Sequence, residues 1–196
     1  MLSTETDVIL ASASPRREEL LSIIVKEFRV IPSEFDESLV PQKLGPRDHV
    51  AHSSLMKARD IAKKHPDSLV IGADTIVSID AAILGKPSDT SDAFQMLKRL
   101  AGRTHQVYTG IAVIKDGIEQ GGVECTEVTF RELDDDMISR YVSTGEPMDK
   151  AGAYAIQGKG AVLVKTICGC YSNVVGLPIY HLSTVLEEFG VQLLVD

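Results

Sequence analysis

The sequence predicts an α/β or α+β fold built on a long mixed β-sheet with flanking helices. Short apolar, β-rich runs alternate along the chain with segments whose apolar residues recur at helical spacing. Two long β-rich runs between residues 105 and 130 are joined at Asp116-Gly117, a strong signal for an antiparallel hairpin. Helical crossovers favour parallel pairing and hairpins favour antiparallel pairing, so we expect both kinds in one sheet.

In the first half of the chain, elements alternate between strand and helix. We expect strands at 8–12, 28–33 and 68–80, helices at 15–25 and 46–65, an acidic loop at 33–37, and a returning hairpin strand at 81–87. Ser14-Pro15 is a helix-start signal, because serine caps a helix and proline suits its first position. Gly72-Ala73-Asp74 predicts a break in the third strand, with Asp74 at a sheet edge.

The second half continues the alternation. We expect a helix at 90–102, two strands within 105–130, a helix at 133–147, a glycine-rich loop at 148–161, a strand at 161–167 and a helix at 178–189. Gly102 and Gly190 follow helical patterns and predict their ends. No internal repeat or low-complexity linker is present, so residues 1–196 are expected to form a single domain, in one compact lobe or in two.

Charge and cysteine content limit the possible partners and compartment. The chain has 20 basic and 28 acidic residues, a net charge of −8, which argues against extended nucleic-acid or anionic-membrane surfaces. Its apolar runs are shorter than the roughly 18 residues of a membrane span. Residues 1–7 are polar and acidic, so no cleavable signal is expected, and the three cysteines are expected to be reduced in a cytoplasmic protein.

Two arginines stand where helix electrostatics disfavours them. Arg16 and Arg17 fall in the first turn of the helix predicted at 15–25, an end that carries roughly half a positive charge. Free backbone N–H groups and two guanidinium groups at that place suit a polyphosphate, with Ser12 and Ser14 as further donors. The alternative is that both arginines are solvated or pair with surface acids.

Other candidate site residues follow later in the chain. Asp74-Thr75 comes after an apolar run, and Lys86 lies in the turn Gly85-Lys86-Pro87 of the same hairpin. An acid at such a place also occurs as a simple turn former. No serine has the G-x-S-x-G context of a hydrolase nucleophile, so metal-assisted attack of water on a phosphate fits better.

Several motifs in order resemble the Maf family of nucleoside triphosphate pyrophosphatases. The matching segments are "LASASPRREELL", "SEFDE", "MKA", "GADTIV", "GKP", "HQVYTG", "GEPMDKAGAYAIQGKGA" and "NVVGLP". The resemblance covers nearly the whole chain. It implies the fold shared with inosine triphosphate pyrophosphatases, with two lobes around a deep cleft. It also implies a homodimer, and Mg²⁺- or Mn²⁺-dependent conversion of a nucleoside triphosphate to the monophosphate and pyrophosphate.

The resemblance also implies roles for individual residues. Asp74 would activate water, and with Glu37 it would hold the metal near the substrate. The implied phosphate contacts are Ser12, Arg17, Lys57 and Lys86. The residues that would select dTTP and UTP are Arg16, Thr75 and Gln157. One departure is Met56, where the family usually has a polar residue next to Lys57.

Two alternatives to this activity remain open at this point. The first is a nucleotide-binding regulator of cell division, since the family has been linked to septum formation. A carboxylate aimed at the phosphates, as expected for Asp74, favours catalysis over mere binding. The second is a purine-directed inosine triphosphate pyrophosphatase, against which the set of Arg16, Thr75 and Gln157 argues.

Overall fold

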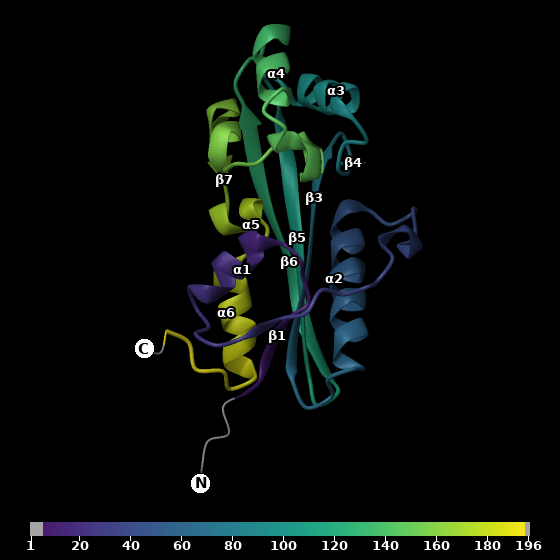
Figure 1. The fold of residues 1–196 in the computed structure, drawn as a ribbon, viewed down its shortest axis with the longest axis vertical. Coiled ribbons are helices and arrows are strands. Elements are labelled where there is room, and N and C mark those ends of the chain that lie inside the picture. The colour runs from purple at the N-terminus through teal and green to yellow at the C-terminus, as the bar shows by residue number, and fades with distance from the viewer. Residues whose placement is uncertain (1–5, 195–196) are drawn as a thin grey trace.

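The structure is a computed structural model that describes residues 6–194, and it confirms the mixed sheet with flanking helices (Figure 1). The expectation of no cleavable signal concerns residues that lie almost wholly outside this range. Within it, the sheet has seven strands, in the order β2-β1-β3-β5-β6-β7, with β4 also paired to β3. The strands are β1 (Val8–Leu10), β2 (Arg29–Val30), β3 (Leu69–Ile79), β4 (Ala82–Leu84), β5 (Thr104–Lys115), β6 (Ile118–Phe130) and β7 (Val164–Cys168).

Strand pairing is parallel at one edge of the sheet and antiparallel in the rest. β1 pairs in parallel with both β2 and β3, whereas β3, β5, β6 and β7 pair antiparallel in sequence. The hairpin between β5 and β6 turns at Asp116 and Gly117, whose φ values are 51° and 76°. Two successive left-handed residues form the turn that Asp-Gly favours, so this hairpin is as predicted.

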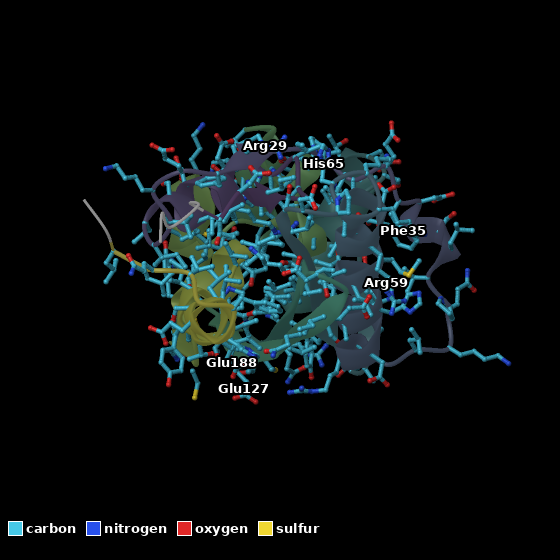
Figure 2. All side chains as sticks on the ribbon, turned by 90° about the horizontal axis from the view of Figure 1, so that it is seen from below. Arg29, Phe35, Arg59, His65, Glu127 and Glu188 are labelled. Carbon is cyan, nitrogen blue, oxygen red and sulfur yellow. The ribbon has the colours of Figure 1, made fainter. Side chains whose placement is uncertain are left out.

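The helices cover both faces of the sheet and one of its ends. They are α1 (Pro15–Ser22), α2 (Pro46–Ala62), α3 (Thr90–Leu100), α4 (Asp135–Val142), α5 (Tyr171–Val175) and α6 (Ile179–Glu188). α2 lies on one face, α1, α5 and α6 lie on the other, and α3 and α4 lie at one end (Figure 1). Figure 2 shows the two faces from below, with Arg59 of α2 and Glu188 of α6 on opposite sides. No helix between residues 6 and 194 combines the length and apolar character needed to cross a membrane.

The hydrophobic core is divided in a way that produces two lobes. One cluster packs α1 and α6 against the sheet, and a second packs α2 on the opposite face. A third, separate cluster joins α3 and α4 to the far ends of β3, β5 and β6. The lobe of α3 and α4 is therefore connected to the other mainly through the long strands, and the expected two-lobed shape is confirmed.

The predicted break in the third strand is wrong, because β3 runs without interruption through Gly72, Ala73 and Asp74. Gly72 allows α2 to pack closely against β3, because a Cβ at this position would lie 2.3 Å from the carbonyl oxygen of Ser54. A Cβ at Gly110, on the neighbouring strand β5, would lie 2.3 Å from the carbonyl oxygen of Val50. Both glycines permit close helix–sheet packing rather than a turn.

Some element ends also differ from the sequence prediction. α4 ends at Val142 rather than 147, because Gly145 adopts φ 76° and starts a separate 3₁₀ turn at Glu146–Asp149. α1 ends at Ser22 rather than 25, and β2 has two residues instead of six. Ser14 occupies the N-cap position of α1, yet its side chain makes no capping hydrogen bond. The short helix α5 carries no cap or periodicity long enough to predict it.

A buried histidine lies in the core of the α3–α4 lobe. His105 is 0% exposed, and its Nε2 lies 2.8 Å from the hydroxyl of Tyr154. Its ring packs edge-on against Phe130 and Tyr154, with centroids 5.0 and 5.3 Å away. Burial lowers the pKa of His105 from 6.5 to about 4, because the charged form cannot be hydrated there.

This pKa predicts a loss of stability in mild acid. Below pH 6.5 the unfolded chain binds a proton at His105, whereas the folded protein does not until about pH 4. The free energy of unfolding should therefore fall between these pH values, by on the order of 3 kcal/mol from this group. Urea unfolding at several pH values measures the loss, and His105→Gln should show a smaller one. The same pH slope in both proteins would contradict the prediction.

Candidate active site

A cleft opens where β3 lacks a neighbouring strand. β5 pairs with β3 along one edge, so β1, which pairs with residues 69–71, and β4, which pairs with residues 77–79, share the other edge. Residues 72–76 lie between them without a strand partner on that edge. The cavity next to this gap has a volume of about 670 Å³ and is lined by residues of both lobes.

All nine residues to which the family resemblance gives a role line this cavity, although they come from six separate parts of the chain. They are Ser12, Arg16, Arg17, Glu37, Lys57, Asp74, Thr75, Lys86 and Gln157. Asp74 lies in the middle of β3, where the missing strand leaves its side chain facing the cavity, and not at the end of a broken strand as expected. A side chain in an unpaired stretch of a central strand can reach a ligand while its backbone stays fixed by β5.

Two carboxylates share one lysine at the base of the cleft. Nζ of Lys57, on α2, lies 2.6 Å from Oδ1 of Asp74 and 2.7 Å from Oε1 of Glu37. The side chains of Lys57 and Asp74 are 11% and 9% exposed, whereas that of Glu37 is 61% exposed. No residue from 6 to 194 makes a hydrogen bond to Oδ2 of Asp74, so this oxygen is available to a ligand in the cleft.

The carboxylate pair fits a divalent cation that binds together with its substrate. Asp74 and Glu37 converge on one positive charge, the ammonium of Lys57. Across residues 6–194 there is no cluster of three or more histidine, cysteine or acidic side chains that could hold a metal without other ligands. Mg²⁺ commonly uses one or two carboxylates and completes its shell with water and phosphate oxygens, which is the donor set available here.

Arg17 is held in the wall of the cleft by three hydrogen bonds. Its Nε donates to the carbonyl oxygen of Gly176 at 2.8 Å, Nη1 to Oγ of Ser12 at 3.2 Å, and Nη2 to Oγ1 of Thr75 at 3.0 Å. Burial lowers the pKa of Arg17, while Asp74 and Glu37 oppose this shift. The guanidinium is therefore rigidly placed, and its remaining N–H groups are the ones that a ligand could use.

Arg16, Lys86 and Gln157 surround the outer part of the cleft. Lys86 follows β4 in an exposed loop, and the carbonyl oxygen of Gly85 accepts a hydrogen bond from the backbone N–H of Gly152 at 3.0 Å. Gln157 is half-buried and precedes the 3₁₀ turn Gly158–Leu163. Arg16 is the second residue of α1, on the opposite lobe. The three side chains therefore approach the cavity from both of its sides.

Sequence reasoning missed three groups that shape the site. Lys150 and Tyr154 line the cleft, and Lys150 forms an ion pair with Asp149. Lys150, and to a smaller extent Arg16, hold the pKa of Asp149 below its ordinary value. The only signal for these residues was their place in the segment "GEPMDKAGAYAIQGKGA". Such a glycine-rich segment is equally typical of a flexible surface loop without a binding role.

Glu146, in the same segment, supports the loop that carries Gln157. Its carboxylate accepts hydrogen bonds from the hydroxyl of Tyr141 at 2.9 Å and from the backbone N–H groups of Lys159 and Gly160 at 3.0 and 2.8 Å. The loop passes so close to Glu146 that a Cβ at Gly158 would lie 2.7 Å from Oε2. The carboxylate therefore fixes the backbone directly after Gln157.

Known proteins with similar sequences match almost the entire chain. A "dTTP/UTP pyrophosphatase" of Clostridium botulinum (strain Okra / Type B1) is 50% identical over 192 residues, covering 95% of this chain and 99% of the relative. A protein of the same name from Clostridium botulinum (strain Alaska E43 / Type E3) is 51% identical over 185 residues, covering 92% and 98%.

A solved structure shares the fold at much lower sequence identity. The Staphylococcus aureus Ham1 protein superimposes with a TM-score of 0.52, covering 94% of this chain and 97% of its own, at 15% identity. This likeness concerns the fold alone. The model of the family described as "Maf-like protein" matches residues 7–189. From that match and the two relatives at about 50% identity, the chain belongs to the Maf family.

Proposed function

We propose that this protein is an enzyme that hydrolyses dTTP and UTP to the nucleoside monophosphate and pyrophosphate. The name of the relatives at about 50% identity supports the reaction and the substrates. The observation that carries the proposal is the pair of carboxylates on Lys57, at the base of a cleft whose walls also hold Arg16, Arg17 and Lys86. This arrangement combines a base, a cation site and positive charge for phosphates.

In the proposed reaction, Asp74 acts as the general base. Its free Oδ2 accepts a proton from a water molecule, whose oxygen attacks the α-phosphorus. The bond from the α-phosphorus to the bridging oxygen breaks, and pyrophosphate leaves with the electron pair. Ser12, Arg17, Lys57 and Lys86 hold the phosphates and neutralise the charge that develops on them.

We propose that Asp74 and Glu37 hold Mg²⁺ or Mn²⁺ together with phosphate oxygens. When bound, the metal would draw charge from the phosphate under attack and help to orient the triphosphate. The exposed position of Glu37 suits a ligand that must accommodate substrate entry and product release. Buried Asp74 is the more rigid of the two carboxylates.

We further propose that the protein forms a homodimer and works in the cytoplasm, without nucleic-acid or membrane partners. Its net charge of −8 and its three free cysteines support a small-molecule enzyme of a reducing compartment. Light scattering of the purified protein tests the dimer, for which we expect twice the chain mass of 21.3 kDa.

A product assay tests the proposed activity. The purified protein is incubated with dTTP, UTP, CTP, ATP, GTP and inosine triphosphate, and pyrophosphate and orthophosphate are measured separately. We expect pyrophosphate from dTTP and UTP, and loss of the activity when a chelator removes Mg²⁺ and Mn²⁺. Direct release of orthophosphate, or full activity in excess chelator, would overturn the proposed mechanism.

Substrate choice and phosphate binding should depend on different residues. The amide of Gln157 offers a donor and an acceptor to the O–C–N–H edge of uracil or thymine. Gln157→Ala should therefore lower kcat/KM for dTTP and UTP more than for purine triphosphates. Lys86→Ala should weaken every triphosphate by a similar factor, because all share the phosphates. The measurement is the pyrimidine-to-purine ratio of kcat/KM. A ratio altered by Lys86→Ala but not by Gln157→Ala would reverse the assignment.

A further inference from the structure

A chain of hydrogen bonds runs from the cleft into the core behind it. Nη2 of Arg17 donates to Oγ1 of Thr75 at 3.0 Å, and Oγ1 of Thr75 lies 3.0 Å from Oγ1 of Thr109 on the paired strand β5. Oγ1 of Thr109 donates in turn to the carbonyl oxygen of Asn173 at 3.0 Å. Thr75 lines the cleft, whereas Thr109 and Asn173 are both 0% exposed.

The direction of each hydrogen bond follows from the chemistry of its groups. A guanidinium can only donate and a carbonyl oxygen can only accept, so Thr75 accepts a hydrogen bond from Arg17, and Thr109 donates one to the carbonyl oxygen of Asn173. Oγ1 of Thr109 is then free to accept, and the hydroxyl proton of Thr75 points to it. The other acceptor near Thr75 is the carbonyl oxygen of Gly176 at 3.4 Å, which already accepts from Arg17 at 2.8 Å.

Thr75 consequently presents only an acceptor to the cleft. Its proton is directed into the protein toward Thr109, and one lone pair of Oγ1 remains for a ligand. Such an acceptor is satisfied by a base edge that carries an N–H donor. Uracil and thymine carry a proton on N3, whereas N3 of cytosine is an acceptor. An acceptor facing an acceptor leaves both groups without a hydrogen bond.

We propose that Thr109 is a positioning residue. It makes the hydroxyl of Thr75 a hydrogen-bond acceptor toward the cleft, so that the site selects uracil and thymine over cytosine. The inference rests on the proposed function and deepens it. Thr109 does not line the cleft, so it acts on the base only through the hydroxyl of Thr75. Removing its hydroxyl frees the proton of Thr75, which can then turn toward the cleft and donate to N3 of cytosine.

The test compares Thr109→Val with Thr109→Ser as the matched control. Valine keeps the shape of threonine but cannot accept a hydrogen bond from Thr75, whereas serine keeps the hydroxyl. The UTP-to-CTP ratio of kcat/KM should fall about fivefold or more in Thr109→Val, the size of one neutral hydrogen bond. It should change less than about twofold in Thr109→Ser. An equal loss with UTP and CTP in Thr109→Val, or an equal change of the ratio in both variants, overturns the inference.

A double-variant comparison separates the proposed role from a general structural one. In a Thr75→Val background the hydroxyl through which Thr109 acts is gone, so adding Thr109→Val should leave the UTP-to-CTP ratio unchanged. A further fall of the ratio in the double variant would show that Thr109 acts by another route. Thermal unfolding of each variant establishes that the proteins compared are folded.

A substrate analogue tests the same contact without relying on Thr109→Val to fold. N3-methyl-UTP lacks the N3 proton, so the wild-type protein should hydrolyse it with kcat/KM at least about tenfold below that for UTP. The difference should shrink in Thr75→Val. Equal kcat/KM for UTP and N3-methyl-UTP in the wild type overturns this inference but leaves the proposed function standing. Failure of the wild type to hydrolyse UTP and dTTP overturns the proposed function and, with it, this inference.

Discussion

Asp74→Asn should lower the turnover of dTTP and UTP by at least about 100-fold while the protein still folds. Asparagine has nearly the same shape and can still accept a hydrogen bond from Nζ of Lys57, which lies 2.6 Å from Oδ1 of the aspartate. Its amide nitrogen takes the place of a carboxylate oxygen, so the side chain neither accepts a proton at neutral pH nor binds a cation well. General-base roles typically contribute about 10²–10⁴-fold.

Asp36→Asn is the matched control for this experiment. Asp36 is an exposed acid next to Glu37, and its Oδ1 accepts from the backbone N–H of Ser38 at 2.9 Å, which an asparagine oxygen also does. Initial rates of pyrophosphate release should therefore stay within about twofold of the wild-type rate in the control. Nucleotide binding is measured with a non-hydrolysable analogue. If Asp74→Asn keeps more than about a tenth of the wild-type rate, Asp74 is not the base.

Lys57→Met removes the positive charge between two carboxylates and should affect both stability and activity. Asp74 would be left 9% exposed without its cation, and breaking a fully enclosed ion pair in this way costs about 3–5 kcal/mol. Asp74 lines an open cleft, so we expect the lower end of this range, about 3 kcal/mol. Turnover should also fall, because a phosphate contact is lost and the carboxylates repel the triphosphate.

Urea unfolding of single and double variants measures the two effects separately. Adding Asp74→Asn to Lys57→Met removes the unpaired charge, so the double variant should be more stable than Lys57→Met alone and remain inactive. An unchanged free energy of unfolding in Lys57→Met would mean that the ion pair contributes nothing to stability. Normal turnover in that variant would remove Lys57 from the phosphate contacts.

Features that depend on neighbouring residues could be predicted from the sequence. The Asp116-Gly117 hairpin, the starts of α1 at Pro15 and of α2 at Pro46, and the alternation of strands and helices are all present. Turns and caps are decided by backbone preferences within a few residues, so local sequence carries them. The grouping of nine residues in one cleft was also anticipated, but through the family motifs rather than through physical reasoning.

Contacts between distant segments decided the rest. The sequence alone could not show whether Gly72 forms a turn or lies beneath a packed helix. The reason for the glycine is the close approach of Ser54 on α2, a residue distant in the sequence. The sequence by itself identified the candidate site residues, and its motifs identified the family. Only the tertiary structure placed Lys57 between Asp74 and Glu37 and brought the hydroxyl oxygens of Thr75 and Thr109 within 3.0 Å of each other. Charge pairing and hydrogen-bond direction depend on atoms within about 3 Å, and folding brings those atoms together from positions far apart in the sequence.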